Sequence, residues 1–316
     1  MKLISIIIPI YNEKENVPLF FEEFLKINEQ LKDKYLFELL FINDGSSDSS
    51  INELYKLEDD NKTNIIIKTL DFARNFGKEI ALTAGIENAD GDACLMIDAD
   101  LQHPIELIPN FIKKWEEGFD VVIGVREHNK GEGIIKKMGS KLYYSVMNRI
   151  SDTKIIPRAT DFRIIDKSVI ESFLKFTERK RMTRALIDWL GFKRDYIYFN
   201  ANERKFGKAS YDVVKLTKLA LNSFINHSLF PLKIAGYLGA LITIFFGPLG
   251  LFIFIGRYFT HSDFALSFTG SALLAIVNAF LIGIVLSSLG LIALYIANIE
   301  NEVKNRPLYV VRKRRK

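Results

Sequence analysis

Two aspartates separated by one residue, Asp98 and Asp100, carry the clearest potential for chemistry in this sequence. They follow an apolar run at residues 93–97 and precede Pro104, which opens a segment with helical spacing. Carboxylates at the end of a buried strand suit Mg²⁺ or Mn²⁺, which bind a few protein carboxylates and keep other positions for substrate phosphates. Acidic pairs are also common in turns, and Asp100 could instead cap the following helix. The pair alone leaves both interpretations open.

Polar side chains follow three other predicted strands in the same manner. They are Tyr11, Asn12 and Glu13 after the first strand, Asp44 and Ser46 after the second, and Asp71, Arg74 and Asn75 after the third. The carboxyl ends of parallel strands meet at one edge of a sheet, which is where open α/β folds bind their ligands. This convergence predicts a site for a ligand that carries phosphate and a metal.

The spacing of apolar residues predicts the elements that hold these side chains. Strand patterns at residues 3–8, 37–42, 65–70, 93–97 and 121–123 alternate with helical patterns at 17–31, 51–57, 78–87 and 105–115. Such alternation predicts an α/β fold with a doubly wound, mostly parallel sheet. Beyond residue 124 we expect helices at 136–149, 168–176 and 179–189, a strand at 196–199 and a basic loop at 203–211.

The last third of the chain is overwhelmingly apolar. No charged residue occurs over 23 positions at 234–256, nor over 36 positions at 264–299. A membrane span needs about 20 residues, so residues 229–299 are predicted to form two transmembrane helices, at about 232–257 and 266–298. The segment before them, 212–228, is amphipathic and is expected to lie in the membrane interface, although an ordinary surface helix is the alternative.

This organisation predicts a cytosolic domain at 1–211, the interfacial helix, the transmembrane hairpin and a basic cytosolic tail at 300–316. Lysines and arginines flank both ends of the hairpin, which predicts a multi-pass protein of the cell membrane with both termini in the cytoplasm. The tail is expected to face anionic lipid, or else to be a solvated end. No signal peptide is recognised.

Composition argues against several other functions. The 316 residues carry a net charge of +5, much of it in the tail, without the aromatic-interleaved basic patch of a nucleic-acid-binding module. The four histidines are scattered, which disfavours a zinc site, and the single cysteine, Cys94, is expected to pack in the core. No G-x-G-x-x-G follows the first strand, which excludes a hydride-transfer enzyme of that type.

Four segments together resemble family 2 glycosyltransferases of the GT-A fold, namely residues 5–13, 41–48, 74–79 and 98–104. Within that family the chain is similar to the polyprenyl-phosphate glycosyltransferases, which include bactoprenol glucosyltransferase and dolichol-phosphate mannose synthase. That similarity rests on Asp161-Phe162-Arg163, an Arg204-x-x-Gly207 loop, the two apolar segments and residues 306–309. Relatives usually have glycine where this chain has Thr160, and many have Ser-Lys-Tyr at 209–211, where Lys208 is expected to substitute for the lysine.

The resemblance implies a role for each matching residue. Asp98 and Asp100 would bind Mg²⁺ or Mn²⁺, and Asp161, Asp100 and Gln102 would be catalytic. The residues expected to bind the nucleotide sugar are Pro9, Tyr11, Asn12, Glu13, Asp44, Lys78, Asp98, Ala99, Asp100, Gln102, Arg204 and Lys208. Those expected at the acceptor phosphate are Arg126, Lys137 and Arg163. A phosphate monoester is already largely a dianion at neutral pH, so Asp161 could be a base or could instead orient the acceptor.

The implied reaction moves a hexose, with glucose or N-acetylglucosamine favoured, from a UDP-sugar to undecaprenyl or another polyprenyl phosphate on the cytoplasmic face, with inversion. The product would be a lipid-linked donor for modification of cell-envelope glycans. A GDP-mannose-dependent mannosyltransferase and a non-catalytic nucleotide-sugar-binding membrane protein are the alternatives. A processive polysaccharide synthase is disfavoured because no Gln-x-x-Arg-Trp motif is present. A separate flippase, a downstream transferase and a homo-oligomer are further expected partners.

Overall fold

A computed structural model of the chain describes residues 1–127, 156, 158–179, 181–202, 255, 259 and 269–314. The chain divides into two compact units, one formed by Met1–Ser210 with Arg306–Lys316 and the other by Tyr211–Asn305. The candidate site lies in the first unit.

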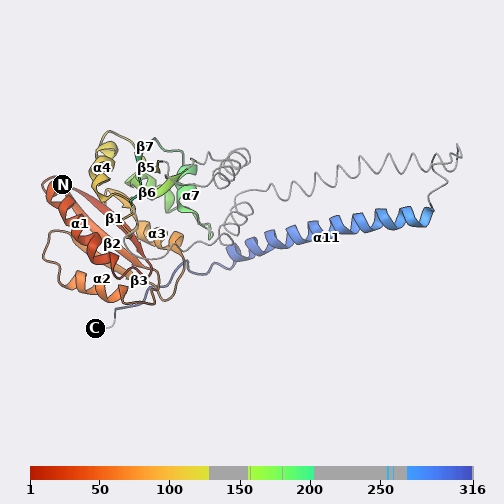
Figure 1. The fold of residues 1–316 in the computed structure, drawn as a ribbon, viewed down its shortest axis with the longest axis horizontal. Coiled ribbons are helices and arrows are strands. Elements are labelled where there is room, and N and C mark those ends of the chain that lie inside the picture. The colour runs from red at the N-terminus through yellow and green to blue at the C-terminus, as the bar shows by residue number, and fades with distance from the viewer. Residues whose placement is uncertain are drawn as a thin grey trace. The chain divides into compact units, whose positions relative to one another are not determined.

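A seven-stranded sheet forms the centre of the first unit, in the order β3-β2-β1-β4-β6-β5-β7 (Figure 1). Its strands are β1 Lys2–Ile10, β2 Tyr35–Asn43, β3 Ile66–Asp71, β4 Ala93–Met96, β5 Val121–Arg126, β6 Ala159–Asp166 and β7 Arg194–Phe199. The four strands β1 to β4 pair in parallel, as do β5 and β7, whereas β6 is antiparallel to both of its neighbours. The predicted mostly parallel α/β sheet is confirmed.

Helices cover both faces of this sheet. They are α1 Asn16–Leu31, α2 Ser50–Asp59, α3 Lys78–Glu87, the short 3₁₀ helix η1 Ile105–Leu107, α4 Ile108–Glu116, α6 Lys167–Phe173 and α7 Thr183–Trp189. Successive side chains of a strand point to opposite faces. Accordingly Ile6 and Ile8 of β1 pack with α1, α2 and α4, while Ile7 packs with α3, α6 and α7. Burial on both faces explains the continuous apolar run of β1.

The strand β6 is an element that the sequence pattern did not predict. It inserts between β4 and β5, so two strands that follow one another along the chain are not neighbours in the sheet. Charged residues interrupt its apolar pattern, and its pairing is with distant segments, so no local signal identifies it. This strand matters for the site because it contains Asp161 and lies next to β4.

The second unit contains α11, a continuous helix over Gly270–Val303. Counted over the described residues, no helix is long and apolar enough to cross a membrane. The predicted helix at 136–149, the interfacial helix at 212–228 and the first predicted span at 232–257 lie outside the described residues. The predicted tail is divided, because Arg306–Lys316 groups with the first unit and residues 300–305 with the second.

Candidate active site

The carboxyl ends of β1, β2 and β3 lie side by side at one edge of the sheet. Ile10, Asn43 and Asp71 are paired in register across the three strands, and Ile7 of β1 is paired with Met96 at the end of β4. The loops that follow these strands therefore meet at one place. The predicted convergence of polar strand ends is confirmed.

Asp44 anchors the loop at residues 72–77, which leads into α3. Its buried carboxylate accepts hydrogen bonds from the backbone amides of Phe76 at 2.6 Å and of Gly77 at 2.9 Å. Burial raises the pKa of Asp44, and the two amide donors oppose that rise. Gly45 adopts φ +63, and a Cβ there would lie 2.4 Å from the backbone carbon of Arg74. The Asp-Gly sequence thus lets the loop pack closely against the end of β2.

The loop after β1 is fixed by Asn12, which adopts the left-handed φ of 57. Its side-chain oxygen accepts hydrogen bonds from the Ser47 amide at 2.8 Å and from the Ser47 hydroxyl. Glu13 accepts a hydrogen bond from the side chain of Asn16 at 2.5 Å, and Pro9 lies within β1. Tyr11, the residue after β1, is half exposed.

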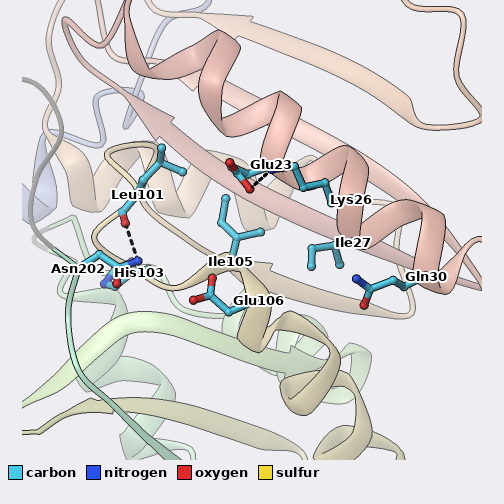
Figure 2. A pocket seen from close by; sticks show the side chains of 9 residues that line it. All are labelled: Glu23, Lys26, Ile27, Gln30, Leu101, His103, Ile105, Glu106 and Asn202. Atoms are coloured by element: carbon cyan, nitrogen blue, oxygen red, sulfur yellow. Dashed lines mark hydrogen bonds and ion pairs between the residues drawn. The ribbon is translucent and has the colours of Figure 1, made fainter.

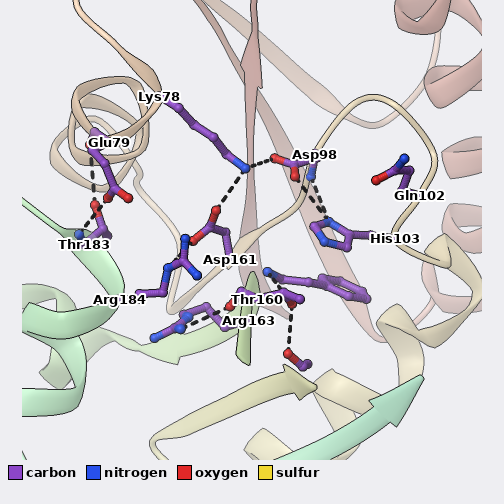
Figure 3. Close-up of polar contacts among 12 residues, drawn as sticks. Lys78, Glu79, Asp98, Gln102, His103, Thr160, Asp161, Arg163, Thr183 and Arg184 are labelled. Atoms are coloured by element: carbon purple, nitrogen blue, oxygen red, sulfur yellow. Dashed lines mark hydrogen bonds and ion pairs between the residues drawn. The ribbon is translucent and has the colours of Figure 1, made fainter. Parts of the chain in front are cut away.

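A cluster of alternating charges occupies the centre of the edge (Figure 3). Lys78, the first residue of α3, places its ammonium nitrogen 2.6 Å from Oδ1 of Asp98 and 2.9 Å from Oδ2 of Asp161. The guanidinium Nε of Arg184 lies 3.2 Å from Oδ1 of Asp161. These four side chains come from α3, from the loop after β4, from β6 and from α7, so the cluster depends on the packing of four separate elements.

The cations control the ionisation of this cluster. Burial by itself would raise the pKa of both Asp98 and Asp161, but the adjacent Lys78 outweighs burial and lowers both values, with Arg184 adding to the effect on Asp161. Burial by itself would lower the pKa of Lys78, but Asp98 and Asp161 raise that pKa above its ordinary value. The cluster is therefore fully ionised at neutral pH.

Arg184 is a site residue that sequence analysis missed. The backbone amide of Thr183 donates a hydrogen bond of 2.7 Å to the carboxylate of Glu79. This contact joins the beginning of α7 to the beginning of α3, and it brings the adjacent residues, Arg184 and Lys78, to the same carboxylate (Figure 3). Nothing in the basic run around residue 184 distinguishes this arginine from its neighbours.

The turn after β4 is stabilised by a hydrogen bond between its own residues. Oδ1 of Asp100 accepts a hydrogen bond from the Gln102 amide at 3.1 Å, and Leu101 between them adopts φ +60. Asp100 thus closes a local turn, and η1 is capped by Pro104 without a side-chain hydrogen bond. Ala99 is buried in the core. The alternative assignment of Asp100 as a helix cap is wrong.

His103 packs between this turn and the aromatic core. Its Nδ1 accepts a hydrogen bond from the Asp98 amide at 3.3 Å, and its ring stacks on Phe162 with the centroids 5.2 Å apart. Burial lowers the pKa of His103, so the imidazole is neutral and serves as an acceptor. Its observed contacts are structural.

The basic residues expected at the acceptor phosphate differ in position. Arg126 donates a hydrogen bond of 3.2 Å to the side-chain oxygen of Gln102, beside the aspartate turn. Arg163 is fully buried, donates to the Thr160 carbonyl and faces Asp188 at 3.6 Å. The assignment of Arg163 to the acceptor phosphate is therefore wrong. Its buried side chain contacts Thr160 and Asp188 and stabilises the surroundings of β6. Lys137, Arg204 and Lys208 lie outside the described residues.

The carboxylates suit a divalent cation that substrate phosphates help to bind. Asp98 is partly exposed at the strand end, and its hard oxygens and those of Asp100 match the preference of Mg²⁺ and Mn²⁺ for one or two protein carboxylates. Among the described residues, no group of three or more histidine, cysteine, aspartate or glutamate side chains is placed to hold a metal. The donor set thus fits a metal shared with a ligand better than a metal held by protein alone.

A pocket of about 390 Å³ lies on the other side of the aspartate turn, between α1 and η1 (Figure 2). Its lining residues are Glu23, Lys26, Ile27, Gln30, Leu101, His103, Ile105, Glu106 and Asn202. It excludes Lys78, Asp98 and Asp161, so the charged cluster and not this pocket is the candidate active site.

Comparison with known proteins identifies the family of the chain. A family model described as Glycosyl transferase family 2 matches residues 5–174. An uncharacterized glycosyltransferase of Synechocystis sp., sll0501, is 37% identical over 308 residues, which cover 98% of this chain and 94% of the relative. The glycosyltransferase YkcC of Bacillus subtilis, also uncharacterized, is 38% identical over 314 residues, with 98% and 93% covered.

A third relative has a named activity. The SfII prophage-derived bactoprenol glucosyl transferase of Shigella flexneri is 34% identical over 310 residues, which cover 98% of this chain and 97% of the relative. The resemblance inferred from the motifs is confirmed, as is the α/β fold with a mostly parallel sheet that it implies. The chain is a glycosyltransferase that belongs to glycosyl transferase family 2.

Proposed function

We propose that this glycosyltransferase transfers a hexose from a nucleotide-diphosphate sugar to a polyprenyl phosphate. The observation that carries the proposal is the cluster of Lys78, Asp98, Asp161 and Arg184 at the carboxyl edge of the sheet. Two carboxylates beside two cations suit a substrate pair in which both the leaving group and the nucleophile are phosphates. The bactoprenol glucosyl transferase that matches nearly the full chain supports the same acceptor class.

The donor is proposed to lie along the edge formed by β1 and β2. The exposed ring of Tyr11 is suited to stack on the base, while Asp44, Asn12 and Glu13 hold the surrounding loops in place. Asp98 and Asp100 would hold Mg²⁺ or Mn²⁺, which neutralises charge on the departing diphosphate. Lys78, whose ammonium group bridges Asp98 and Asp161, is proposed to compensate part of the same charge.

Asp161 is proposed to orient the acceptor rather than to remove a proton. Its pKa lies below the ordinary value because Lys78 and Arg184 outweigh the effect of burial, which makes it a weak base. The second pKa of a phosphate monoester is about 6, so the acceptor is already largely deprotonated at neutral pH. Arg184 and Arg126 are proposed to bind phosphate oxygens, which suit a guanidinium fork.

A membrane location is part of the proposal. A polyprenyl acceptor presents its phosphate at the membrane surface, and the uncharged sequence at 264–299 is long enough for a tilted span. The proposed topology remains the hairpin with the catalytic unit and both termini in the cytoplasm. The homo-oligomer, the separate flippase and the role in envelope glycans stay predictions.

Glucose from a UDP-sugar is the proposed donor, with N-acetylglucosamine next. The name of the Shigella relative supports glucose. GDP-mannose is the alternative donor.

The full chain in lipid nanodiscs should be incubated with undecaprenyl phosphate and, separately, UDP-glucose, UDP-N-acetylglucosamine and GDP-mannose, with and without Mn²⁺. Glycosylated lipid, detected by mass spectrometry, is expected with one UDP-sugar and metal. Asp98→Asn should abolish it, while Asp90→Asn, which removes an exposed carboxylate paired with Lys68, should not. Absence of lipid product with every donor, alongside activity of a known relative in the same assay, would refute the proposal.

A further inference from the structure

The C-terminal strap, defined here as residues 306–314, packs against the catalytic unit beside the donor edge. We propose that this strap positions the loop at residues 72–77 for binding of the nucleotide, with Tyr309 as the positioning residue. The inference rests on the proposed function, since it concerns the affinity of the same site for its sugar-nucleotide donor. Sequence analysis placed these residues in a basic tail, either facing lipid or solvated, and used residues 306–309 only for the family resemblance, so it predicted no contact with the sheet.

The strap adds backbone pairing at the outer edge of the sheet. β3 is the terminal strand, and Phe72, immediately after it, forms an antiparallel bridge with Val311. The Ala73 amide donates to the Val310 carbonyl at 2.8 Å, and the Arg312 amide donates to the Asp71 carbonyl at 2.7 Å. These bonds satisfy backbone groups that an edge strand would otherwise expose, and they fix the start of the 72–77 loop.

Tyr309 connects the start of this loop with the end of α3. Its ring stacks on the fully buried ring of Phe72, with centroids 5.0 Å apart and planes 19° from parallel. Its hydroxyl donates to Glu87 at 2.9 Å and accepts from the Asn88 side chain at 3.1 Å. Because Glu87 ends α3, one side chain holds the entrance to the loop and the far end of the helix that follows it.

The contacts continue from Tyr309 to the donor edge. Phe72 meets the ring of Phe76 edge to face at 5.6 Å, and the guanidinium of Arg74 lies 4.0 Å from the centre of the same ring. The amides of Phe76 and Gly77 are the two donors to Asp44. Gly77 in turn precedes Lys78. A displaced Phe72 would therefore disturb both the Asp44 anchor and the start of α3.

A purely structural strap would cover the sheet edge and stabilise the fold without affecting the affinity for the donor. The distal end of the strap provides a control for this alternative. Arg314 forms an exposed ion pair with Asp59 and lies 4.4 Å from the ring centre of Tyr55. These contacts reach α2 and do not touch the 72–77 loop, so Arg314 reports on strap docking alone.

The test uses three variants of the full chain, Tyr309→Ala, Tyr309→Phe and Arg314→Ala. Steady-state kinetics should give KM for donor and for polyprenyl phosphate separately, and thermal unfolding should give Tm. Loss of the stacked ring in Tyr309→Ala is expected to raise the donor KM about fivefold while the acceptor KM is unchanged. Tyr309→Phe keeps the stacking and should recover most of the donor affinity, and Arg314→Ala should match the wild type in donor KM.

Hydrogen exchange supplies a readout that does not need the reaction. The Phe76 and Gly77 amides should exchange about tenfold faster in Tyr309→Ala than in the wild type, with little change in Arg314→Ala. Unchanged exchange, or a lower Tm with an unchanged donor KM, would overturn the inference. If the wild type transfers no sugar from a nucleotide sugar, the proposed function fails. Faster exchange of the Phe76 and Gly77 amides in Tyr309→Ala would still show that the strap positions the loop.

Discussion

The ammonium nitrogen of Lys78 lies 2.6 Å from Oδ1 of Asp98. The same nitrogen lies 2.9 Å from Asp161, so one cation compensates two carboxylates that arrive from different strands. A carboxylate left without its cation in a partly buried site costs free energy. Lys78 is therefore expected to serve the stability of the site as well as the charge of the donor.

Lys78→Met should lower kcat/KM for the nucleotide sugar by about 10- to 100-fold, because a charge-assisted contact to phosphate is worth about 1.5–3 kcal/mol. Its effect on the free energy of unfolding should be smaller, about 1 kcal/mol, since Lys78 is 42% exposed and Arg184 still faces Asp161. Initial rates at varied donor concentration and chemical denaturation measure the two quantities.

A double-mutant cycle tests the coupling directly. In the Lys78→Met background, Asp161→Asn should cost less stability than it does in the wild type, because the carboxylate is no longer paired with a lysine. Additive effects of the two substitutions would show that the observed ion pair contributes nothing measurable.

The sequence predicted the part of the site that local patterns encode. Asp98, Asp100 and Asp44 each lie in the loop that follows an apolar strand run, so their place at the edge could be predicted from periodicity. The same local patterns predicted the parallel strands β1 to β4. Here the residue types and the elements that hold them lie close together in the chain.

The remaining features depend on contacts between distant segments. Arg184 reaches Asp161 because Glu79 binds Thr183, and Tyr309 reaches Phe72 through pairing at the sheet edge. Arg163 follows Asp161 by two residues and could have served a phosphate, yet it is buried within the sheet, where it pairs with Met96 of β4 and Ile123 of β5. Such outcomes are set by tertiary packing, which single-sequence periodicity does not contain.

Asp161→Asn should remove most of the turnover and leave the donor KM within about threefold of the wild type. The neutral amide can no longer balance Arg184 and leaves Lys78 paired with Asp98 alone, so the charges proposed to face the acceptor phosphate would change. Asp166→Asn is the matched control, because Asp166 ends the same strand and caps α6 through Ser168. It should cost little stability, because asparagine is about as good an N-cap as aspartate, and it should leave turnover unchanged. Full activity of Asp161→Asn would remove Asp161 from the reaction.

Removal of divalent metal should abolish transfer and weaken binding of the nucleotide diphosphate. Calorimetric titration of UDP is expected to show loss of affinity after EDTA treatment and recovery with Mn²⁺ or Mg²⁺, since the diphosphate supplies the ligands that the protein lacks. Asp98→Asn and Asp100→Asn should each abolish the metal-dependent gain. If UDP binds equally well without metal in the wild type, the two aspartates have another role.

The acid limb of the pH profile should belong to the acceptor. The pKa of Asp161 is lowered, so its carboxylate stays ionised through the neutral range, and the stability contributed by its ion pairs is lost only as pH falls below the ordinary carboxyl value of about 4. The phosphate monoester protonates near pH 6, so kcat/KM for the acceptor should fall below about that pH. A thiophosphate acceptor, whose second pKa is lower, should move the limb to lower pH, and Asp161→Glu should leave its position unchanged. A limb that stays in place with the thiophosphate but moves in Asp161→Glu would instead make Asp161 the base.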